Sequence, residues 1–161
     1  MSRARVTFVQ TTRNTKAELL ARNPVFRAVC HMPMQTTKQT DLALAARMAF
    51  ESVQRGTAND ADRATLVCLV NVAMVLAGKH CAAENLKDQL AAQEALLRAD
   101  GRVLQGKAWN FDGEGRAAIL RAIDAHEQQI AQLGHGLVTD ALLTVMDMRA
   151  AGHVHRVELT A

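Results

Sequence analysis

The chain has 161 residues with a net charge of +3, and 49% of its residues are apolar while 3% are aromatic. A chain of this length fits one domain that buries roughly 70% of its unfolded surface, so no disulfide scaffold is needed to complete a core. With one Trp, four Phe and no Tyr, packing falls to Ala, Leu, Val and Met, which suits closely spaced helices better than a β-sandwich. The three cysteines, Cys30, Cys68 and Cys81, are an odd set, as expected of a reduced, cytoplasmic chain.

Residues 1–38 are expected to form a basic, extended, Thr-rich arm. Residues 1–40 carry seven basic residues and one acid, a net of +6, whereas the remaining 121 residues carry 12 basic and 15 acidic residues, a net of −3. Such asymmetry is typical of a segment that binds an acidic partner, although a merely soluble polar segment has the same composition. Residues 5–9, RVTFV, are β-branched and aromatic near period two, so a short strand is expected there.

The first helix is expected over residues 41–54, with Thr40 as its N-cap. Its apolar residues recur at helical spacing and predict one face toward a core: Leu42, Leu44, Ala45, Met48, Ala49, Phe50 and Val53. Arg55 and Gly56 end this helix as a basic last turn and a C-terminal glycine. Asn59 then caps the next helix.

The run Ala64–Ala77, ATLVCLVNVAMVLA, is apolar on every side and predicts a long central helix sheathed by the others. The 14-residue run is shorter than the roughly 20 residues that a membrane span needs, so no membrane segment is expected. Gly78 allows either one kinked helix reaching about Leu104 or two helices meeting near Lys79. Five residues of the run are predicted to be buried: Leu66, Leu69, Val70, Ala73 and Leu76.

Residues 105–115 form the one substantial internal loop, which carries Trp109 and Phe111. A further helix begins at Asp112 or Gly113 and ends at Gly134 and Gly136, and its coiled-coil-like seam is Ile119, Ile123, His126, Ile130 and Leu133. Thr139 is expected to cap the last helix, which ends at Gly152. The sequence therefore predicts an all-α helical bundle over residues 39–152, with the arm before it and a β-like tail over 153–161.

The residues that could carry chemistry do not form a catalytic or metal-binding pattern. Cys30-His31 and His80-Cys81 are adjacent pairs, and neighbours on a helix point about 100° apart, so they lack the spacing of a structural zinc site. His153 and His155 share one face of a strand, but they are an isolated pair. No cysteine or serine is placed beside a base and an orienting acid. We expect no metal, no cofactor and no enzymatic activity.

Four features, taken together, resemble small helical proteins of unknown role encoded on bacterial prophages and other mobile elements. They are the basic Thr-rich arm, the helix ALAARMAF at Ala43–Phe50, the run Gly56–Ala77 ending in NVAMVLA, and the Trp109 loop before an amphipathic hairpin. The resemblance spans roughly residues 40–150 and transfers no catalytic residue. It implies a mobile-element accessory protein, and within that context a product that binds and disables host defence machinery.

The sequence thus predicts a non-enzymatic protein that binds another macromolecule, with a protein complex engaged in nucleic-acid processing or defence as the leading partner. A homo-oligomer remains open. The alternative is a nucleic-acid-binding accessory factor that uses the arm on phosphates. Aromatic residues in glycine-rich loops anchor partners, although a loop folded over the end of the bundle is equally consistent with the sequence. The predicted partner-binding residues are Arg3, Arg5, Phe8, Arg13, Lys16, Trp109 and Phe111.

Overall fold

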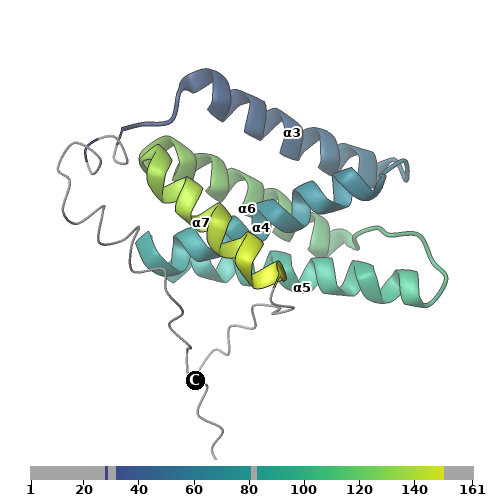
Figure 1. The fold of residues 1–161 in the computed structure, drawn as a ribbon. Helices are drawn as coiled ribbons and strands as arrows, with labels where there is room; N and C mark the ends of the chain where they lie inside the picture. Colours follow the sequence, from purple (N-terminus) through teal and green to yellow (C-terminus); the bar gives the residue numbers. More distant parts are fainter. Residues whose placement is uncertain (1–27, 29–31, 81–82, 151–161) are drawn as a thin grey trace, which may run out of the picture.

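A computed structural model describes residues 28, 32–80 and 83–150 of the chain. This part is a helical bundle of five helices without a strand (Figure 1). The helices are α3 (Thr36–Gln54), α4 (Asp60–His80), α5 (Ala83–Leu104), α6 (Gly113–Gln132) and α7 (His135–Ala150). An isolated antiparallel bridge joins Pro33 to Gly134. The strands expected at residues 5–9 and in the tail, and nearly all of the arm, lie outside the described residues.

Helix α4 contacts each of the other four helices of the described part. Figure 1 shows α3 and α5 on opposite sides of the bundle, with α4, α6 and α7 between them. Helices α4 and α5 run antiparallel, because Arg63 in the first turn of α4 donates to Asp100 near the end of α5 at 3.1 Å. Of the two alternatives for Gly78, the one with two helices is therefore found, with α4 ending at His80.

Helix α4 is buried along much of its length but not on every side. Leu66, Val70, Ala73 and Leu76 are buried as predicted, whereas Leu69 is only partly buried, so its prediction was too strong. Val67, on the first half of the helix, is 36% exposed. Helix formation beyond the apolar run gives α4 21 residues.

The prediction of no membrane segment depended on the short length of the apolar run, and the full length of α4 removes that argument. Within the described residues, Asp60–Lys79 is long and apolar enough to cross a membrane, with a hydropathy of 1.5. A helix packed at the centre of a globular bundle meets the same criterion. The absence of a membrane segment stays a prediction.

The helix starts divide into two that were predicted correctly and two that were wrong. Asn59 caps α4, since its Oδ1 accepts from the backbone N–H groups of Ala61 and Asp62 at 2.8 and 3.0 Å. Asp112 caps α6 by accepting from the N–H of Gly115 at 2.6 Å. Thr40 and Thr139, by contrast, lie one turn inside α3 and α7.

Each of these two threonine hydroxyls donates to the carbonyl four residues earlier, at 3.0 Å from Thr40 to Thr36 and 2.9 Å from Thr139 to His135. A threonine just beyond the first turn satisfies its hydroxyl this way without capping anything. Helix α3 consequently takes in the last three residues that were assigned to the arm.

The core has two parts, one at each half of α4. The first joins α3, α4, α5, α6 and the loop aromatic residues, and its largest members are Phe50, Val53, Leu66, Val70, Leu96, Trp109, Phe111, Ile119 and Ile123. The second joins α4, α6 and α7 through Met34, Val72, Val75, Leu76, Ile130, Val138 and Ala141. Met34 shows that the chain before α3 is also part of the bundle.

The apolar face predicted for α3 is only half buried. Ala46, Ala49, Phe50 and Val53 face the core, whereas Leu42, Leu44 and Met48 are exposed. The spacing of these residues predicts one wide buried face, whereas the structure has a buried stripe and an apolar outer side.

Candidate interaction surface

The loop between α5 and α6 is folded onto the bundle. Trp109 and Phe111 are 8% and 6% exposed, so the expectation that they form an exposed anchor is wrong and the folded-loop alternative holds. The Trp109 ring meets the Phe111 ring edge-on at 5.2 Å, and Phe111 stacks on Phe50 of α3 at 6.3 Å. In this position the two rings complete the core and are not presented to a partner.

Polar contacts hold Trp109 in place. Its indole Nε1–H donates to Asp100 Oδ1 at 2.8 Å, and the Arg63 guanidinium lies 5.1 Å from the ring centroid. Arg63 in turn donates to the same Asp100 oxygen, so one carboxylate joins α4, α5 and the loop. A tryptophan N–H that is buried normally has such a partner.

The buried polar side chains form structural contacts between helices. The His126 Nδ1 lies 3.3 Å from Gln129 Oε1, and Gln129 Nε2 donates to the Ala73 carbonyl of α4 at 3.1 Å. Burial lowers the pKa of His126, while its hydrogen bond to Gln129 opposes that shift. A histidine held neutral by burial and bound to a neutral amide lacks the orienting carboxylate that a catalytic base uses.

Cys68 is the one cysteine whose side chain is described, and it is half-buried. Burial raises the pKa of its thiol, and the charge of Arg149 only partly opposes that shift. A thiol with a raised pKa is a poor nucleophile because the thiolate is the reactive form. The described residues contain no group of three His, Cys, Asp or Glu side chains that could hold a metal ion. His31, Cys30, Cys81 and the histidine pair of the tail lie outside them, as does the side chain of His80.

Helix α7 carries the apolar surface that sequence reasoning missed. Only Val138 and Ala141 of its 16 residues are buried. Leu142, Leu143 and Met146 are 39%, 40% and 58% exposed, and we call these three residues the α7 apolar face. Val145, which lies between Leu143 and Met146 in the sequence, is partly buried and packs against the second part of the core.

The limited burial of α7 follows from its position. Its main helix neighbour is α4, which it crosses as Figure 1 shows. The positive charge of Arg149 lies close enough to Cys68 to lower the pKa of its thiol. The last turn of α7 is therefore near the first half of α4. A helix that rests on one neighbour buries one stripe and leaves the rest of its apolar surface open.

The predicted basic residues Arg3, Arg5, Arg13 and Lys16, together with Phe8, lie outside the described residues. Among the helices, five arginines are engaged in ion pairs with carboxylates: Arg47, Arg55, Arg63, Arg98 and Arg121. The described bundle therefore uses much of its positive charge internally.

No protein-family model, curated protein or solved structure matches this chain.

Proposed function

We propose that this chain is a non-enzymatic binding protein whose α7 apolar face docks on an apolar surface of another protein. The observation that supports the proposal is the exposure of Leu142, Leu143 and Met146 on adjacent turns of one helix. Contiguous exposed apolar side chains are characteristic of protein interaction sites, whereas isolated ones are common on any surface. Met146 lies four residues after Leu142 and three after Leu143, and both spacings make side chains neighbours on the surface of a helix.

The chemistry of the described residues agrees with a role in binding. Of the two side chains best suited to acid–base or nucleophilic work, His126 is buried with its Nδ1 against Gln129, and burial raises the pKa of the Cys68 thiol, which lowers its thiolate fraction. The resemblance to prophage-encoded helical proteins favours a partner inside a host nucleic-acid-processing or defence complex. An apolar helix surface that fits a partner groove would supply both affinity and specificity in such a complex.

Co-purification from the organism that encodes the chain tests this proposal. Wild-type protein should recover a partner in near-stoichiometric amount, and the variants Leu143→Glu and Met146→Glu should lose it, because a charge in an apolar contact leaves an unpaired ion. Leu97→Glu on α5 is the matched control, since Leu97 is 54% exposed and Met146 is 58% exposed. Recovery of the same partner by wild type and by both α7 variants would contradict the proposal.

The charge of the first 40 residues favours a second candidate, a nucleic-acid-binding factor. Each phosphate contact made by Arg3, Arg5, Arg13 or Lys16 would make affinity fall by about 0.9 log units per tenfold increase in salt. Deletion of residues 1–27 is the suitable test, because Met34 is buried and the Met32 carbonyl accepts from the N–H of His135. We expect only weak binding of the full chain to duplex DNA at physiological salt. Submicromolar binding that this deletion abolishes would place the nucleic-acid candidate first.

A further inference from the structure

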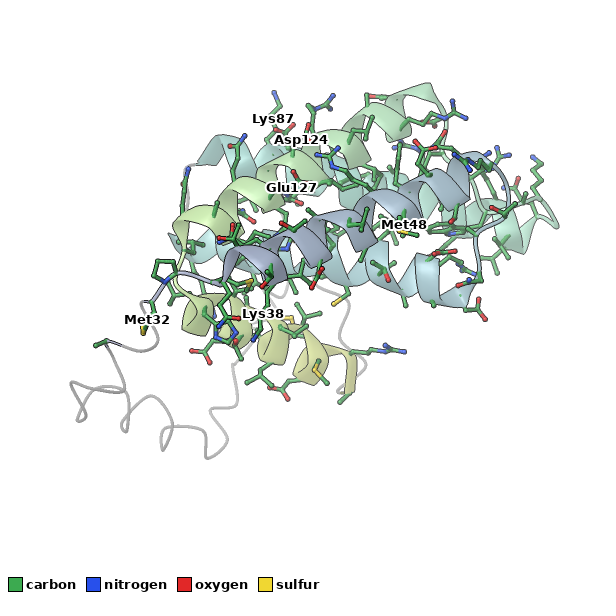
Figure 2. All side chains as sticks on the ribbon, turned by 90° about the horizontal axis from the view of Figure 1, so that it is seen from above. Met32, Lys38, Met48, Lys87, Asp124 and Glu127 are labelled. Carbon is green, nitrogen blue, oxygen red and sulfur yellow. The ribbon has the colours of Figure 1, made fainter. Side chains whose placement is uncertain are left out.

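The rotation of α3 about its own axis is fixed by two sets of contacts. The first set is made by four side chains that pack into the core: Ala46, Ala49, Phe50 and Val53. The second set is made by Arg47, which binds α6. The Arg47 guanidinium donates to Glu127 Oε1 at 2.9 Å, to Glu127 Oε2 at 3.0 Å and to Asp124 Oδ1 at 2.8 Å. Figure 2 looks down on α3 and shows the two carboxylates to one side of this helix, with Met48 on the helix itself.

With α3 held in this way, a second stripe of residues is turned outward. Five residues lie on this outward side of the helix, because they follow one another at steps of three, one, three and seven residues: Asp41, Leu44, Ala45, Met48 and Arg55. Leu44 and Met48 are 56% and 60% exposed. The Arg55 side chain is 75% exposed and forms one long ion pair, 3.8 Å, with Glu51 of its own helix, so most of its surface stays open to a second carboxylate. We call these five residues the α3 outer strip.

The order of charges along this strip points to its occupant. An acid stands at the N-terminal end and an arginine at the C-terminal end, with the apolar residues between them. A parallel second copy would set Asp41 against Asp41 and Arg55 against Arg55. An antiparallel copy related by a two-fold axis at Met48 sets Asp41 of each chain opposite Arg55 of the other, because both lie seven residues from Met48.

The same charges select the register. If the axis instead lay midway between Leu44 and Met48, so that these two residues paired, Asp41 of one chain would lie opposite Glu51 of the other. That contact is repulsive. The axis at Met48 instead brings the two Met48 side chains together and sets Leu44 opposite Ser52, which is half-buried in the single chain. Isologous contacts of this kind are the commonest route to a homodimer.

We infer that the α3 outer strip pairs antiparallel with the same strip of a second copy of this chain, with Asp41–Arg55 ion pairs at both ends. The contact is small, because each helix supplies two large apolar side chains. Small interfaces of this type are weak and reversible. The α7 apolar face is not part of it, so the dimer and the proposed partner can be tested separately.

Sedimentation velocity of the full chain, with concentration raised stepwise from the micromolar to the millimolar range, tests the inference. Wild type should shift from monomer to dimer as concentration rises. Asp41→Arg and Arg55→Asp should each remain monomeric over that range, since each places like charges together at both ends. The double variant D41R/R55D restores opposite charges and should dimerise as wild type does.

Two controls separate this contact from others. Met48→Glu should abolish the dimer, while Leu97→Glu, a comparably exposed site on α5, should leave it unchanged. Circular dichroism confirms that each variant is folded. A wild-type chain that stays monomeric, or a dimer that neither charge variant weakens, would overturn the inference. A double variant that stays monomeric would overturn the antiparallel arrangement on which the inference rests.

Discussion

Replacing Trp109 with Ala should destabilise the fold by several kcal/mol, because the ring is built into the core. A buried aromatic side chain removes about 150–250 Å² from water, which at about 25 cal/mol per Å² corresponds to about 4–6 kcal/mol as an upper estimate. Measured replacements of Phe or Trp by Ala in cores cost about 3–5 kcal/mol. For a chain of 161 residues this corresponds to a fall in Tm of roughly 6–20 °C.

Trp109→Phe divides this cost into its parts. It keeps an aromatic ring against Phe111 but removes the N–H that donates to Asp100. A hydrogen bond to a carboxylate contributes about 1.5–3 kcal/mol when buried, and the Asp100 side chain is half exposed, so we expect about 1 kcal/mol. Leu104→Ala on the neighbouring turn is the control, since Leu104 is 90% exposed and should change stability by less than about 0.5 kcal/mol.

Urea denaturation followed by circular dichroism measures these free energies, because Trp109→Ala removes the only tryptophan. In the wild type, the same residue gives a clean fluorescence probe, since the chain has no tyrosine. Its emission should be blue-shifted and weakly quenched by acrylamide until the chain unfolds. A Trp109→Ala cost below about 1 kcal/mol, with strong quenching in the native state, would refute the folded loop and return Trp109 to the partner-anchor hypothesis.

Three further predictions concern the helices. Leu66→Ala, at a fully buried site, should cost about 2–5 kcal/mol in urea denaturation, and Leu69→Ala, at a partly buried one, should cost clearly less; equal costs would contradict the packing of α4. Asn59→Ala should cost about 1 kcal/mol as the loss of an N-cap, whereas Thr40→Ala and Thr139→Ala should each change stability by under about 0.5 kcal/mol. Burial lowers the pKa of His126, so the unfolded chain takes up a proton at this residue before the folded chain does. The contribution of His126 to the free energy of unfolding is therefore complete above the ordinary histidine pKa of 6.5 and is lost as the pH falls below it. His126→Asn should flatten this part of the urea midpoint–pH profile.

The residues that were predicted well are those whose signal is local. Asn59 and Asp112 begin their helices because each is followed, within three residues, by the backbone N–H groups it caps. Ile119, Ile123 and Ile130 are buried because one helical stripe decides their environment. The cap predictions at Thr40 and Thr139 were wrong for the same local reason, since a threonine serves equally well as an N-cap and as a residue one turn inside a helix, bonded to the carbonyl four positions back.

The surface could not be predicted, because it depends on how many neighbours each helix acquires. Leu42, Leu44 and Met48 have the spacing of a buried face, yet Arg47 binds α6 and turns Leu44 and Met48 outward. Trp109 looked like an exposed anchor because nothing in a glycine-rich loop reveals that Asp100 and Arg63 lie beneath it. The α7 apolar face follows from a helix that rests mainly on α4, which is a fact of tertiary arrangement.

The central claim, that the α7 apolar face binds another protein, is tested most directly by site-specific photo-crosslinking in the native cells. A photoreactive residue is placed at Met146, and the same residue at Leu97 on α5 serves as the control. We predict a crosslink from position 146 to a protein other than this chain, and none to that protein from position 97. Crosslinks to that protein from position 97 but not from 146, or no crosslink to another protein from position 146, would contradict the claim.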